Sequence, residues 1–100
     1  LAIFIGSFKS SYSNRLLQGN GTSASSSTTG TTYFYSGEID AATATANTFG
    51  NAEIYIPNYS GSNYKVVSAE TVSENNATSA YATMTAGLWS NTAPITSISF

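Results

Sequence analysis

Residues 64–72 read Tyr-Lys-Val-Val-Ser-Ala-Glu-Thr-Val, and this stretch is the clearest indicator of the fold. It is rich in β-branched residues, which is typical of a β-strand. The side chains of a strand point alternately to its two faces. One face would therefore carry Tyr64, Val66, Ser68, Glu70 and Val72, and the other would carry Lys65, Val67, Ala69 and Thr71.

Similar runs on either side of this stretch predict further strands. Residues 52–56 alternate in the same way, and residues 80–88 would place Ala82, Met84, Ala86 and Leu88 on a buried side. About seven short strands with turns between them predict an all-β fold, namely an antiparallel β-sandwich or a jelly-roll-like arrangement. The remaining runs are at residues 1–8, 12–18, 31–39 and 95–100, and the turns of the second half are at 57–63, 74–78 and 91–94.

Two segments fall outside this pattern. Residues 19–32 are a low-complexity run of Ser, Thr and Gly without a large side chain, which predicts a loop. Residues 40–49 would form a short helical turn capped by Asp40, with a loop or an edge strand as the alternatives.

The length of 100 residues indicates one domain, residues 1–100. Both ends of the chain read as strands, whereas free termini are usually polar and frayed. We therefore expect the chain to be the ordered part of a longer polypeptide. The alternative is a mature, processed subunit.

Composition excludes several classes of site. The chain has no Cys and no His, so it cannot form a disulfide, a Cys- or His-ligated metal site or a Ser-His-Asp triad. The three basic residues, Lys9, Arg15 and Lys65, are too few to neutralise a nucleic-acid backbone. No apolar run approaches the roughly 20 residues that cross a membrane. We expect no cofactor, no metal, no nucleic-acid partner and no membrane insertion.

The surface is expected to be rich in hydroxyl groups and poor in charge. Charged residues make up 8% of the chain, whereas Ser, Thr and Asn account for 40 of the 100 residues. Small uncharged side chains allow neighbouring molecules to approach closely without desolvating charges. This composition suits dense, repetitive packing or an appendage exposed outside a cell.

Five carboxylates are the only groups that could support hydrolysis. Glycoside hydrolysis usually needs a pair of them, and Glu38 and Asp40 would share one face of a strand. The same two residues suit a solvated edge or a helix cap. Since the other three, Glu53, Glu70 and Glu74, also have a structural interpretation, we predict no catalytic residue and a protein that is not an enzyme.

The aromatic residues suggest a second kind of site. Trp89 lies next to a predicted turn, so it is the best candidate for an exposed binding residue. Aromatic rings stack on the C–H faces of sugars, and Asn side chains bind sugar hydroxyls. In a small sandwich, however, most aromatics fill the core or bridge subunits. The candidate glycan-contact residues are Trp89, Asn91, Tyr59 and Asn58.

Two segments of the second half resemble a known group of proteins. One is Ile54-Tyr55-Ile56-Pro57-Asn58-Tyr59, within residues 46–65, and the other is Gly87-Leu88-Trp89-Ser90-Asn91-Thr92-Ala93-Pro94-Ile95-Thr96-Ser97-Ile98. They are similar to an aliphatic-x-Ile-x-x-Tyr segment and a later Gly-x-Trp-x-x-Thr-x-x-Ile-x-x-Ile segment in small virion structural proteins of tailed bacteriophages, common in marine and environmental phages. The further strand with a Tyr-Gly ending that usually follows in that group is absent here.

The resemblance implies a non-enzymatic virion structural protein in the tail, fibre or capsid surface. Such a protein works by multi-copy assembly and, at the particle exterior, by host attachment. Its partners would be copies of itself, other virion proteins and host-surface glycans, and its location would be the virion or the extracellular space. The alternatives are a carbohydrate-binding module or adhesin, and a subunit of an extracellular filament or surface layer assembled through its strands.

Overall fold

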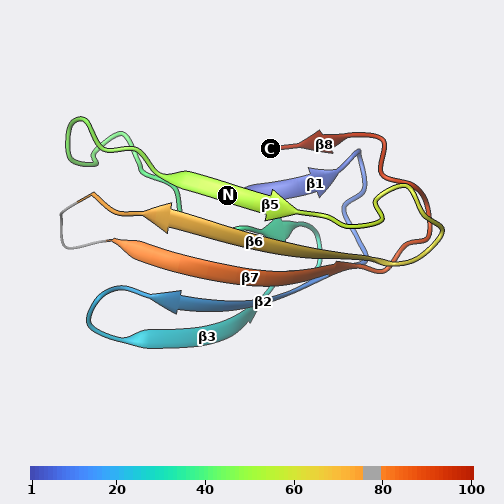
Figure 1. Cartoon of the computed structure of the whole chain (residues 1–100), viewed down its shortest axis with the longest axis horizontal. Coiled ribbons are helices and arrows are strands. Elements are labelled where there is room, and N and C mark those ends of the chain that lie inside the picture. Colours follow the sequence, from blue (N-terminus) through green and yellow to red (C-terminus); the bar gives the residue numbers. More distant parts are fainter. Residues whose placement is uncertain (76–79) are drawn as a thin grey trace.

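The computed structural model of the chain describes residues 1–75 and 80–100. In these residues, antiparallel strands form two sheets, and the predicted all-β sandwich is confirmed with eight strands (Figure 1). The smaller sheet has the order β4-β1-β8, and its strands are Phe34–Tyr35, Ala2–Ile5 and Ile98–Ser99. The larger sheet has the order β3-β2-β7-β6-β5, and its strands are Ala24–Thr29, Tyr12–Gly19, Tyr81–Trp89, Lys65–Ser73 and Asn51–Tyr55.

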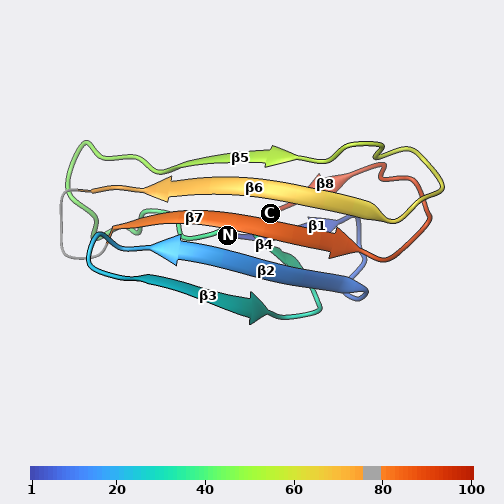
Figure 2. The ribbon, with the colours of Figure 1, turned by 60° about the horizontal axis from the view of Figure 1, so that its bottom comes forward.

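The five-stranded sheet is open on one side. Figure 2 shows its long strands side by side, with β8, β1 and β4 behind them. The inner face of the large sheet is the one that the small sheet covers. Its outer face, on the opposite side, has no second layer of the described chain over it.

The core lies between the two sheets. Tyr12 and Phe34 meet edge to face with ring centroids 4.9 Å apart, and the Tyr12 hydroxyl group accepts a hydrogen bond from the Ile5 backbone N–H and donates one to the Phe8 carbonyl group. Burial raises the pKa of Tyr12, and the hydrogen bond from Ile5 lowers it by a smaller amount. The buried cluster comprises Ile3, Ile5, Tyr12, Phe34, Val67, Trp89 and Ile95.

The buried face of β7 is the opposite of the predicted one. The structure buries Thr83, Thr85 and Trp89, whereas Met84 is 58% exposed. A strand that carries apolar residues on both faces does not reveal by alternation which face is inside. Burial of the single Trp decides it, because the indole is the largest apolar side chain available to this small core.

The loop predicted over residues 19–32 is wrong for its central part, which forms β3. Six residues of this strand pair with β2, from Asn14↔Thr29 to Gly19↔Ala24. Five of the six β3 residues are exposed, so the strand is stabilised by backbone hydrogen bonds and needs no large side chain. The β2 strand, whose sequence signal is weak, consequently has a partner on each side.

Residues 36–50 form a loop with turns, which agrees with one of the alternatives for residues 40–49. Its start is held by Gly37, whose φ of +128° disfavours a side chain, and whose Cβ position would coincide with the Thr71 hydroxyl group. Thr71 donates a hydrogen bond to the Ser36 carbonyl group at 2.8 Å. The turn predicted at residues 74–78 lies mostly outside the described residues.

Asn14 holds β2 to the incoming chain of β4. Its side chain is 2% exposed, and its amide nitrogen donates hydrogen bonds to the carbonyl groups of Gly30 (3.1 Å) and Tyr33 (2.7 Å). Its side-chain oxygen accepts a hydrogen bond from the Tyr35 backbone N–H at 3.3 Å. One buried amide thus satisfies three backbone groups where the chain crosses from the large sheet to the small one.

Replacing Gly87 with Ala is expected to lower the free energy of unfolding by about 1–3 kcal/mol, because it overpacks the core. A Cβ atom at this position would lie 2.6 Å from the Phe34 ring. Gly19→Ala, also in a strand, is the matched control, since nothing lies within 4 Å of its Cβ position. Urea unfolding measures both variants, and equal stabilities would contradict the packing of Phe34 on Gly87.

Candidate functional site

The outer face of the five-stranded sheet carries large apolar side chains that remain exposed. Met84 of β7 is 58% exposed, Leu17 of β2 is 54% exposed and Val66 of β6 is 57% exposed. Tyr55 of β5 is 65% exposed. Exposed apolar residues are ordinary when scattered, but a contiguous patch on a sheet face marks an interaction site.

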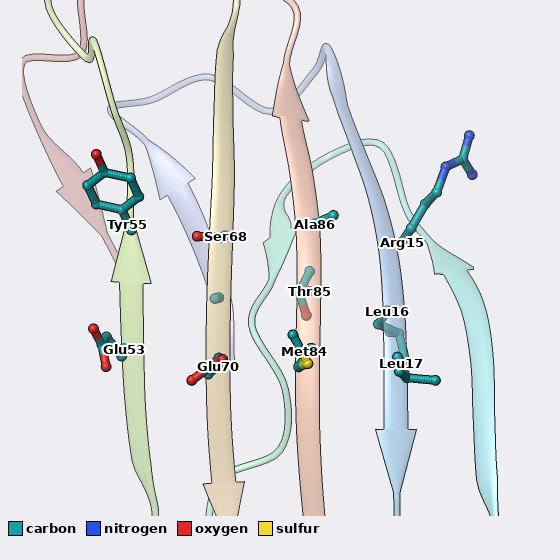
Figure 3. A pocket seen from close by; sticks show the side chains of 11 residues that line it. Arg15, Leu16, Leu17, Glu53, Tyr55, Ser68, Glu70, Met84, Thr85 and Ala86 are labelled. Atoms are coloured by element: carbon teal, nitrogen blue, oxygen red, sulfur yellow. The ribbon is translucent and has the colours of Figure 1, made fainter.

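Strand pairing arranges these side chains in two rows across the sheet. The upper row in Figure 3 comprises Arg15, Ala86, Ser68 and Tyr55, and the lower row comprises Leu17, Met84, Glu70 and Glu53. The small side chains at the centre of the upper row lie beside larger ones, and the result is an open groove of about 640 Å³. The outer face of the sheet is therefore grooved and not flat.

The charges on this face are separated by β7. Glu53 and Glu70 are directly opposite each other on β5 and β6, whereas Arg15 lies on the far side of β7 (Figure 3). Like charges that face each other across a strand pair are destabilising. Within the described residues, none of these three side chains has a hydrogen bond or an ion pair. In the described part of the chain, the acidic pair thus has no cation beside it.

Glu38 and Asp40, the pair expected on one strand face, have separate structural partners. Both lie in the loop of residues 36–50. Glu38 accepts a hydrogen bond from the Tyr35 hydroxyl group, and Asp40 accepts one from the Ser73 hydroxyl group, each at 2.5 Å. Burial, followed by the hydrogen bond and the negative charge of Glu38, raises the pKa of Tyr35. This arrangement ties the loop to its surroundings.

Lys65 is a buried cation that ties β6 to two loops at one end of the sandwich. Its side chain is 0% exposed. Nζ donates hydrogen bonds to the carbonyl oxygens of Gly61 (2.7 Å), Ala93 (2.5 Å) and Asn91 (3.4 Å). It also lies 5.6 Å from the centre of the Trp89 ring. These charge-assisted contacts offset the cost of removing the ammonium group from water.

Trp89 is not the exposed residue that its position next to a turn predicts. Its side chain is 0% exposed, its ring meets that of Phe8 edge to face at 5.2 Å, and the Lys65 ammonium group lies over it. A fully buried ring has no face on which a sugar can stack. Trp89 therefore belongs to the core of this chain.

The structure brings the other three candidate glycan-contact residues to the same end as Trp89. The Ile95 backbone N–H donates a hydrogen bond to the Tyr59 carbonyl group at 2.8 Å, which joins the two loops. Asn91 accepts a hydrogen bond from the Ala93 backbone N–H at 2.8 Å within its own turn. Tyr59 is 57% exposed and Asn58 is exposed. Contact of these residues with a glycan stays a prediction.

The described residues show no cluster of carboxylates that could hold a metal ion. They also contain no helix that is long and apolar enough to cross a membrane. The Glu53 and Glu70 pair lies on the open outer face, exposed to water. Comparisons with protein-family models, curated proteins and solved structures found no match to this chain.

Sequence reasoning missed both Lys65 and the outer face. The position of Lys65 among Val67 and Ala69 on one face of residues 64–72 was an available signal for its burial. Apolar residues on both faces of residues 81–89, with Met84 and Leu88 on one and Trp89 on the other, were the corresponding signal for an exposed apolar face. The Glu53 and Glu70 pair had no such signal, because only the register of β5 on β6 makes them neighbours.

Replacing Lys65 with Met is expected to lower the free energy of unfolding by about 2–4 kcal/mol, because it leaves three inward-facing carbonyl groups without their donor. Lys9→Met is the control, since Lys9 is exposed. Urea unfolding followed by the fluorescence of the single Trp, Trp89, measures both variants. A Lys65→Met variant as stable as the control would show that the buried ammonium group does not hold the loops.

Proposed function

We propose that this chain is a non-enzymatic structural domain of a virion, in its tail, fibre or capsid surface, that works by multi-copy assembly. The observation that supports the proposal most is the uncovered apolar outer face of the five-stranded sheet. A sandwich buries the inner faces of its sheets and commonly keeps outer faces polar. The exposed Leu17, Val66 and Met84 depart from that pattern, and a neighbouring subunit would explain them.

The low charge of the chain supports the same role. Only 8% of the residues are charged, and β3 has no charged residue at all. β3 is an edge strand of the large sheet. Monomeric proteins commonly place charged residues on edge strands, because an edge strand offers unpaired backbone groups to other chains. The edge of β3 is therefore a second surface at which a neighbouring chain could pair.

Glycan binding is a second candidate function, supported by the exposure of Tyr59 and Asn58 on the loop that follows β5. Aromatic rings stack on the C–H faces of sugars and amides bind sugar hydroxyls, so a virion domain that attaches to a host could use both residues.

A glycan array tests glycan binding. If Tyr59 stacks on a sugar, Tyr59→Ala should reduce binding at least about fivefold, by analogy with the roughly 1–3 kcal/mol that stacking of a nucleic-acid base on an aromatic ring contributes. Phe49→Ala is the matched control, because Phe49 is 88% exposed on the loop before β5, away from Tyr59. Trp89→Ala is unsuitable as a test because it removes a fully buried side chain from the core. A blank array for the unmodified chain would contradict glycan binding.

Immunogold labelling of purified phage particles with an antibody against this chain tests the virion role. We expect label on the particles. Label on tail tips and fibres would assign the chain to attachment, and an even coat on the head would assign it to the capsid surface. Label on cell surfaces alone would contradict the proposal and favour an appendage, a surface layer or an adhesin.

A further inference from the structure

We infer that the outer face of the five-stranded sheet is an interface with a second copy of this chain. The two copies are related by a two-fold axis that is parallel to β7 and passes between the two stacked sheets. The inference rests on the proposed assembly role and names the partner at that face. Three observations carry it: the apolar centre of the face, the placement of its charges and its size.

The apolar centre lies where such an axis would pass. β7 is the middle strand of the sheet, and Met84 is the largest exposed side chain on it. A two-fold axis along β7 stacks this strand on its counterpart, so Met84 contacts Met84 of the partner copy. Leu17 flanks it on β2, and the isologous contact buries Met84 of both copies at the centre and places Leu17 over the aliphatic part of the partner's Glu70.

The charges select the direction of the axis. An axis along the strands places β2 of one copy over β6 of the other, so Arg15 lies over the partner's Ser68 and one row from the partner's Glu70. Ser68 is small, which leaves room for the guanidinium group. An axis across the strands through Met84 would instead place β6 over β6 and bring the two copies of Glu70 together, since Glu70 is in the same row as Met84. Only the first arrangement pairs opposite charges.

The same arrangement gives the acidic pair, Glu53 and Glu70, a cation from the partner copy. Glu53 lies directly opposite Glu70 on the next strand, and the described part of the isolated chain provides no cation for either. Arg15 likewise has no acidic partner in its own copy. Since the two-fold axis repeats every contact, each dimer would form this cluster twice, and both guanidinium groups would lie beside an acidic pair.

The face is large enough for a stable pair. Five strands about 4.8 Å apart, up to nine residues long at about 3.3 Å per residue, give a face of roughly 20 by 30 Å. The accessible area of such an uneven face is comparable with the roughly 800 Å² that each partner buries in a standard interface. The molecule as a whole measures 43 × 25 × 20 Å, so this face is one of its broad sides.

Charge reversal and charge exchange test the inference in solution. Sedimentation of the chain over concentrations up to about 1 mM, the dissociation constant of a very weak complex, gives the dimer affinity. We expect Arg15→Glu and Glu70→Arg each to weaken the dimer at least about tenfold, because each leaves like charges facing one another across the interface. The double variant Arg15→Glu/Glu70→Arg should recover most of the affinity. Lys9→Glu, a matched reversal in the exposed loop before β2, should leave it unchanged.

A single engineered thiol tests the position of the axis. The chain has no Cys, so Met84→Cys creates a unique thiol at the centre of the proposed interface. A short bis-maleimide should link two copies of this variant efficiently, and it should link two copies of Thr43→Cys, on the exposed loop before β5, far less. Circular dichroism of every variant checks that the fold is retained.

The outcomes separate this inference from the virion role. The interface is overturned if the chain remains monomeric up to the highest concentration. It is also overturned if Arg15→Glu and Glu70→Arg leave the dimer affinity unchanged. If such a chain still labels phage particles, the virion role stands and another surface contacts the neighbours. A dimer that responds as expected, with no label on any particle, supports the interface and overturns the virion role.

Discussion

The burial of Lys65 is the constraint on which the arrangement of the whole large sheet depends. With its ammonium group bonded to the carbonyl groups of Gly61, Asn91 and Ala93, the side chain of Lys65 points inward, and the period of two along β6 then directs Val67, Ala69 and Thr71 inward as well. A shift by one residue would expose the core and leave the three carbonyl groups without a donor. Lys65 and Trp89 therefore set the register together, since they are directly opposite each other.

The composition of the outer face follows from the inward direction of Lys65 and Trp89. Once Lys65, Trp89 and Tyr12 occupy the inner row, the side chains that alternate with them must face outward, including Leu17, Met84 and Glu70. The chain thus presents apolar side chains on both faces of its central strands, which an isolated sandwich does not need. A partner over the outer face would place the second set in an environment like that of the first.

Hydroxyl and amide groups take much of the role that large apolar residues have in other sandwiches. Asn14, Thr71 and Ser36 are buried, and each has a backbone partner. Backbone pairing holds β3 in place, and five of its six residues are exposed. A domain of 100 residues has a small core, so such hydrogen bonds have a large part in specifying which segments meet.

The sequence by itself determined the all-β class, the approximate positions of the long strands and the absence of thiol and imidazole chemistry, because these follow from local alternation and from composition. Only the tertiary structure decided that residues 24–29 form a strand, that Trp89 is buried and that Thr83 and Thr85, not Met84, face the core. Alternation has two equivalent faces, and the choice between them depends on contacts with distant residues. The Glu53 and Glu70 pair and its separation from Arg15 come from the register between strands, which no local pattern contains.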